Sequence, residues 1–107
     1  MSALSTIVKL PEVRGAVLGD LTGVFLDAVR EKDGESIAAV MGFVASALVQ
    51  AGEQLGLGTL RRAALCGDAR AALLVLDKKH VLTLKVEPAK ALPGVEKHVE
   101  TSIPGQG

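Results

Sequence analysis

The chain has 107 residues and a mass of 11.0 kDa, the size of one ordinary domain. A hydrophobic fraction of 49% and a charged fraction of 22% are typical of a globular protein and exclude a disordered chain. The 12 basic residues balance the 12 acidic ones, and Phe25 and Phe43 are the only aromatic residues. The composition therefore predicts neither a cationic nucleic-acid surface nor an aromatic platform for single strands.

The cysteine content and the uncharged segments bear on the compartment. The single cysteine, Cys66, cannot form an internal disulfide, which suits a reducing compartment. The N-terminus lacks the pattern of a secretory signal. The longest uncharged run, residues 36–52, lies at the lower limit for a bilayer span, and its apolar residues are one-sided. We therefore expect a soluble cytoplasmic domain that does not insert into a membrane.

The N-terminal third is expected to hold a short helix and a hairpin. Apolar residues before Pro11 have the spacing of one helix face, and Pro11 ends that helix. Residues 13–19 and 24–30 are short, apolar and rich in β-branched side chains, which predicts two strands. The turn between them has glycine at both ends, residues 19 and 23, as a hairpin requires.

A long helix is predicted to begin at residues 33–36 and to end at the glycines of residues 56–58. Asp33 or Ser36 can accept hydrogen bonds from the free N–H groups of its first turn. The apolar positions follow the helical period and are expected to face the core: Ile37, Val40, Met41, Val44, Leu48, Ala51 and Leu55.

Three further strands are predicted over residues 59–66, 69–76 and 79–87, joined by tight turns into a meander. The middle strand is apolar on both faces, so we expect it to lie centrally with layers on both sides. After Pro88, a short helix is expected through Val95 and Val99. The order of elements predicts an α/β (α+β) sandwich on a five-stranded, mostly antiparallel sheet.

No internal repeat or linker divides the chain, so we expect a single domain over residues 1–100. Residues 101–107 contain glycine and proline and little to bury, and they are predicted to form a flexible C-terminal tail.

The side of the long helix opposite its predicted core stripe carries no charge between Ser36 and Gly52, where a surface helix usually carries Lys and Glu. Ala38, Gly42 and Ser46 recur every fourth position there, which allows another backbone to approach closely. One interpretation is that the helix is buried on both sides within a single domain. We expect a subunit or partner interface instead, because so short a chain has few elements left to cover this face.

These features together resemble the Roadblock/dynein light-chain family, including the bacterial MglB-like proteins. The matching segments are residues 10–18, the turn at 20–23, the long small-residue helix, residues 55–58, and the meander that ends at 86–88. The resemblance implies a Roadblock (profilin-like) fold, with the long helix on one face of the sheet and short terminal helices on the other.

The resemblance also implies a function. Members of this family form homodimers in which the long helices lie side by side and the third strands join, here residues 59–66. They bind small Ras-like GTPases as regulators or scaffolds, or they serve as purely structural dimeric subunits of motor and signalling complexes. The residues expected at a dimer or partner interface are Ala38, Ala39, Gly42, Phe43, Ser46, Gln50, Thr59, Arg61, Ala63 and Leu65.

The sequence offers little catalytic chemistry. Residues 56–61 begin like a dinucleotide fingerprint, but Arg61 replaces the third glycine and the segment follows a helix. No Walker-type phosphate loop is present in the sequence. Cys66, His80 and His98 lack the spacing of a metal site or of a thiol nucleophile with its base. We therefore predict no enzymatic activity, no catalytic residue, no cofactor and no metal, with a thiol hydrolase at Cys66 as the enzymatic alternative.

Overall fold

The computed structural model describes residues 9–103, and within them it contains a five-stranded antiparallel sheet in the order β2-β1-β5-β4-β3. All four neighbouring strand pairs are antiparallel, which confirms the predicted fold class. The strands are β1 (Val13–Asp20), β2 (Phe25–Val29), β3 (Arg62–Cys66), β4 (Ala71–Leu76) and β5 (His80–Val86). The predicted helix before Pro11 lies outside the described residues.

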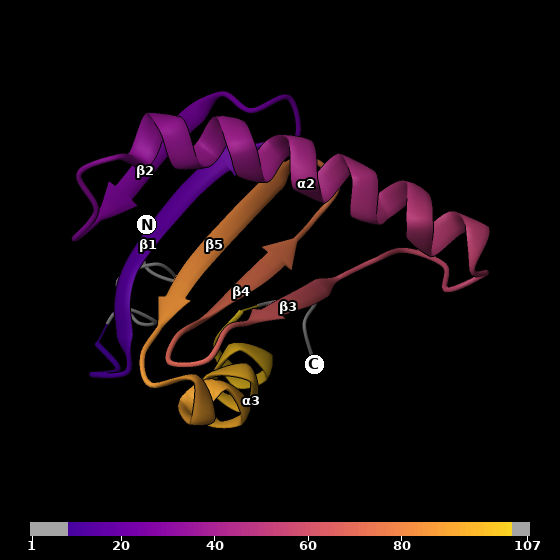
Figure 1. The fold of residues 1–107 in the computed structure, drawn as a ribbon. Coiled ribbons are helices and arrows are strands. Elements are labelled where there is room, and N and C mark those ends of the chain that lie inside the picture. The colour runs from indigo at the N-terminus through magenta and orange to yellow at the C-terminus, as the bar shows by residue number, and fades with distance from the viewer. Residues whose placement is uncertain (1–8, 104–107) are drawn as a thin grey trace.

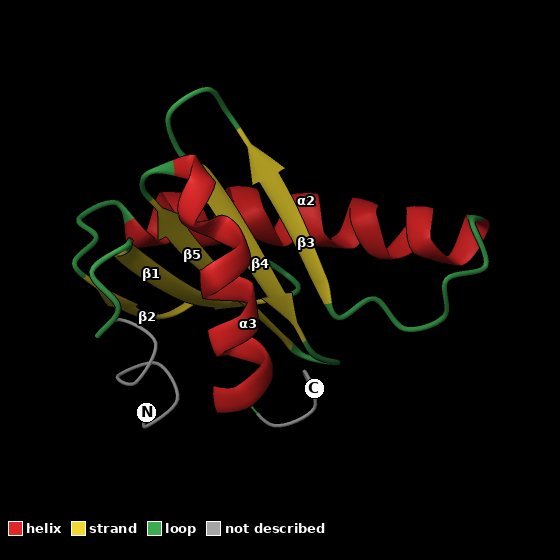
Figure 2. Cartoon of the chain, turned by 90° about the horizontal axis from the view of Figure 1, so that it is seen from below, coloured by secondary structure: helices red, strands yellow, loops and turns green. Residues whose placement is uncertain are grey.

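Two helices cover opposite faces of the sheet (Figures 1 and 2). Helix α2 (Gly34–Gln54) crosses one face, and α3 (Leu92–Ser102) follows a short 3-10 turn, η1 (Ala89–Ala91), on the other. Because α3 continues through Ser102, the first two residues of the predicted tail are helical. The division into a domain and a tail otherwise stays a prediction, since residues 104–107 lie outside the described part.

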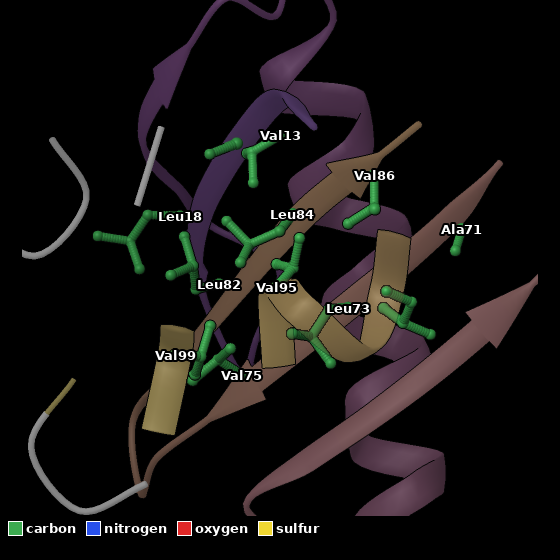
Figure 3. Close-up of a cluster of buried hydrophobic side chains, with 12 residues drawn as sticks. Val13, Leu18, Ala71, Leu73, Val75, Leu82, Leu84, Val86, Val95 and Val99 are labelled. Atoms are coloured by element: carbon green, nitrogen blue, oxygen red, sulfur yellow. The ribbon is translucent and has the colours of Figure 1, made fainter. Parts of the chain in front are cut away.

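The larger apolar cluster lies between the sheet and α3 (Figure 3). Alternate residues of β5 and β4 point to it, among them Leu84 and Leu73, which are 0% and 1% exposed. Val95 and Val99 of α3 close it from the other side. β4 is an interior strand buried on both faces as predicted, but the central position belongs to β5.

The orientation of α2 differs from the prediction. Its buried residues are small: Gly34, Ala38, Gly42, Ala45 and Gly52. Within the predicted core stripe, Val40 is 60% exposed and Leu55 71% exposed, whereas Met41 and Leu48 are half-buried beside the smaller apolar cluster with Leu74. The predicted core stripe is therefore wrong for its outer members. The small residues pack inward because they let the helix axis approach the β1–β2 turn and the sheet closely.

Candidate interaction surface

The β1–β2 turn lies directly against α2 at Gly42. A Cβ built on Gly42 would stand 2.7 Å from the backbone N and Cα of Gly23, so no side chain fits there. The hydroxyl of Ser46 donates a hydrogen bond to the carbonyl of Leu21 at 3.2 Å. Ala38 is 3% exposed, and its Cβ would meet a Cβ built on Gly19 at 3.0 Å. These three residues, predicted at a subunit interface, instead contact the turn and strand of their own chain.

The carboxylate of Asp20 organises this turn. Its Oδ1 accepts hydrogen bonds from the Thr22 hydroxyl at 2.6 Å, from the Thr22 amide at 2.9 Å and from the Val24 amide at 3.0 Å. The hydrogen bond from the Thr22 hydroxyl, followed by the one from the Val24 amide, holds the pKa of Asp20 below its ordinary value. The turn is thus held in one shape where it meets α2.

The face of α2 that points away from the sheet is apolar and exposed. We call Ala39, Val40, Phe43, Ala47 and Gln50 the outer face of α2; all five are exposed, and Phe43 is 78% exposed. No charged residue lies on the helix between Ser36 and Gly52. Of the interface residues predicted on α2, Ala39, Phe43 and Gln50 are therefore accessible to a partner.

Within residues 9–103, strand β3 forms one edge of the sheet and pairs with β4 alone. Thr59 and Arg61, predicted within this strand, lie in the loop that precedes it. Ala63 is half-buried in the smaller cluster beneath α2, whereas Leu65, two residues further on the same face, is 46% exposed. The exposed edge and the exposed Leu65 are available for contact with another chain.

A groove of about 440 Å³ lies on the sheet face that carries α2, at the C-terminal end of β3. Three cations from three segments, Arg14, Arg70 and Lys85, line it together with the carboxylate of Glu87. Leu65 and Ala72, opposite each other on β3 and β4, contribute its apolar lining. This basic groove has no signal in the sequence, because its cations are far apart in the chain and only the strand register brings them together.

Two ion pairs hold two of the three cations of the groove. Arg70 Nε lies 3.2 Å from Glu87 Oε2. Lys85 Nζ donates to Glu31 Oε1 at 2.7 Å, and this hydrogen bond holds the pKa of Glu31 below its ordinary value. Since the Glu31 side chain is 9% exposed, this pair also fixes the loop between β2 and α2 on the sheet.

The candidate catalytic residues do not come together. Cys66 is exposed at the end of β3. His80 Nδ1 lies 3.2 Å from the Asp77 carboxylate in a tight turn, whereas the buried Nε2 of His98 has no hydrogen-bond partner among the described residues. Over residues 9–103, no group of three or more His, Cys, Asp or Glu could hold a metal ion.

Helix α2 is also the one described helix that is long and apolar enough to cross a membrane by length and composition. Core helices of soluble proteins meet the same criterion. In this compact structure its small residues pack on the sheet, as described above.

The fold is that of the Roadblock/LC7 domains, as the resemblance in sequence implied. No protein-family model and no curated protein sequence matches the chain. Among solved structures, MglB of Myxococcus xanthus is similar with a TM-score of 0.82 at 13% identity, over 94% of this chain and 85% of that one.

Two other solved structures have the same fold. An MglB in a tetrameric arrangement gives a TM-score of 0.81 at 16% identity, over 98% of this chain and 82% of that one. A Roadblock/LC7 domain of Streptomyces avermitilis gives 0.71 at 17% identity, over 91% of both chains. Similarity at this level of identity establishes the fold.

Proposed function

We propose that the chain is a cytoplasmic, homodimeric binding module of the Roadblock type, which docks a small Ras-like GTPase and regulates it without catalysing a reaction itself. The observation that carries the proposal is the outer face of α2, with Val40 60% and Phe43 78% exposed, in a fold shared with MglB. An apolar, uncharged surface of this kind on a soluble chain marks a site of protein contact.

The arrangement of β3 and α2 supports a homodimer. β3 is a regular edge strand, and α2 runs past it at the side of the sheet where β3 lies (Figures 1 and 2). Antiparallel pairing of two β3 strands about a twofold axis joins the sheets and brings the two long helices together. The apolar flank of α2, with Val44 and Leu48 half-buried and Leu55 71% exposed, would then be covered. MglB, which has the same fold, has been solved in a tetrameric arrangement, so that protein associates with copies of itself.

The outer face of α2 remains free in such a dimer, because it points away from the sheet. The resemblance in sequence implies binding of Ras-like GTPases, and we place this binding on the outer face of α2. Ala39, Phe43 and Gln50 are the predicted interface residues on α2 that the fold leaves exposed. We assign GTPase docking to these three residues and to Val40.

The test is a titration of the chain with the Ras-like GTPase from the same genome, loaded with a non-hydrolysable GTP analogue or with GDP. We expect tighter binding of one nucleotide state and a changed rate of GTP hydrolysis by the GTPase. Phe43→Asp should abolish binding, since it places a charge at the centre of the apolar face. Lys90→Asp is the control, because Lys90 is exposed on η1, outside this surface.

The outcomes separate regulation from scaffolding. Equal binding of both nucleotide states with no effect on hydrolysis would favour the purely structural dimeric subunit. Absence of binding in either state would overturn GTPase docking altogether.

A further inference from the structure

The basic groove and the C-terminal end of α2 lie at opposite ends of β3, on the same face of the sheet. The helix end leads through residues 55–61 into Arg62, the first residue of β3. The groove includes Leu65, next to the last residue of β3. Leu65 shares its face with Ala63, which packs in the cluster beneath α2, because side chains two apart in a strand point the same way.

The end of α2 is apolar and negatively polarised. Gly56 has a φ of 70°, the Gly56 amide donates to the Glu53 carbonyl at 3.1 Å, and the Leu57 amide donates to the Gly52 carbonyl at 2.9 Å. This is the hydrogen-bond pattern of a Schellman motif, in which the residue at the Leu57 position usually packs on the side chain at the Gly52 position. Since Gly52 has no side chain, Leu57 stays 62% exposed.

The charge at this helix end is also uncompensated within its own last turn. A helix C-terminus carries a partial negative charge and favours cations nearby. The last turn of α2 contains no basic residue, and Glu53 lies within it. Leu55, which follows the helix, is 71% exposed.

We propose that the groove lined by Arg14, Arg70 and Lys85 is the receptor for the C-terminal end of α2 from a second copy of the chain. This inference rests on the homodimer of the proposed function. A twofold axis at the β3 edge exchanges the two ends of β3, so it carries the helix end of one copy to the groove end of the other, on the same face. The chemistry is complementary: exposed leucines meet Leu65 and Ala72, and a negative helix end meets a groove whose three cations outnumber the two carboxylates paired with them.

The complementarity makes the site specific for a second copy of this chain. Glu87 and Glu31 already pair with Arg70 and Lys85, so the groove is only moderately positive. A helix end with one carboxylate, Glu53, and a partial dipole charge matches that balance. Each dimer contains two such contacts, one at each end of the joined strands.

Cross-linking tests the placement. Two variants are made in a Cys66→Ser background, one with Leu57→Cys and the other with Leu65→Cys, and they are mixed and treated with a short bismaleimide reagent. We expect a covalent heterodimer in the mixture. The matched control replaces Leu65→Cys with Leu26→Cys, because Leu26 is also exposed, at 47%, but lies on the opposite edge strand β2. That mixture should give no covalent heterodimer.

Charge reversal tests the electrostatic part. Arg70→Glu and Glu53→Lys should each raise the dissociation constant of the dimer about fivefold by sedimentation equilibrium, as expected for exposed charge pairs. The double variant should return it to within about twofold of the unmodified chain, since the reversed charges attract again.

The results distinguish this inference from the homodimer on which it rests. A dimer that neither cross-links at Leu57 and Leu65 nor responds to the charge reversals would overturn the groove as the receptor and leave the homodimer in place. A chain that stays monomeric at all concentrations would overturn both.

Discussion

Gly42 is where the backbone of α2 approaches the β1–β2 turn, and its missing side chain sets the distance between them. A Cβ at this position would meet the N and Cα of Gly23 at 2.7 Å, and neither backbone atom can rotate away. Close approach through a glycine was expected between two subunits, but here it joins two elements of one chain. The residue therefore matters first for folding.

Gly42→Ala should lower the free energy of unfolding by about 1–3 kcal/mol, because the added methyl group forces the turn and the helix apart. Urea denaturation measures this. Gly94→Ala is the matched control, since a Cβ on Gly94 in α3 meets no atom within 4 Å. That variant should gain about 0.5–1 kcal/mol from the higher helix propensity of alanine. An unchanged stability of Gly42→Ala would contradict the packing described here.

Asp20 gives the turn a defined pH dependence. The Thr22 hydroxyl, first among its hydrogen-bond donors, holds the pKa of Asp20 below the unfolded value of about 4. The associated stability is therefore fully present above about pH 4 and is lost as the pH falls through the lower folded pKa. Thr22→Val should raise the pKa of Asp20 in an NMR titration. The variant should have a lower free energy of unfolding than the unmodified chain at pH 7, and this difference should disappear at acidic pH. A difference that stays constant with pH would contradict this role of Thr22.

At the level of elements, the strands and their turns could be predicted because glycine, proline and aspartate mark their ends. The meander turns are closed by hydrogen bonds from the Gly67 amide to the Arg70 carbonyl and from the Asp77 amide to the His80 carbonyl. The main difference is that β3 begins at Arg62 rather than at residue 59. The glycines at 56 and 58, both with positive φ, end α2 as expected and extend the loop before β3.

The orientation of α2 could not be predicted from its periodicity, because both of its faces are apolar. The large stripe with Val40 and Leu55 has the stronger hydrophobic signal, yet the small residues have the better fit to the turn at Gly23. Which face of such a helix is buried depends on the steric fit between segments that are distant in the chain, and the periodicity of the helix alone carries no information about that fit. The sequence predicted Ala39, Phe43 and Gln50 at an interface, and the structure leaves them exposed. They lie beside the small buried residues, on the part of the helix that turns away from the sheet.

For the whole molecule, the two edges of the sheet are not equivalent. The pairing of β1 with β2 shifts register between Leu18 and Gly19, whereas β3 pairs with β4 without a shift from Arg62 to Cys66. Irregular edges resist continuation by another strand, and regular ones permit it. The β3 edge is therefore the one suited to join a second sheet.

The register of β3 supplies a test of that role. The Leu76 amide donates a hydrogen bond to the Arg61 carbonyl, so Arg61 and Leu76 form a hydrogen-bonded pair. Such pairs alternate along an antiparallel ladder, so the Ala63 amide also bonds to β4. The amide of Ala64, one residue further, points to the open edge. Ala64→Pro removes an N–H that points outward, and an edge strand tolerates proline at such a position. It should leave the monomer folded in circular dichroism and shift sedimentation from dimer to monomer.

Ala63→Pro is the counterpart, because it removes an N–H that bonds to β4 and should destabilise the monomer itself. The two substitutions are chemically identical and one residue apart, so only the direction of the lost N–H distinguishes them. If Ala64→Pro remained dimeric at the dissociation constant of the unmodified chain, β3 pairing would be excluded. Any dimer would then have to form through α2 alone.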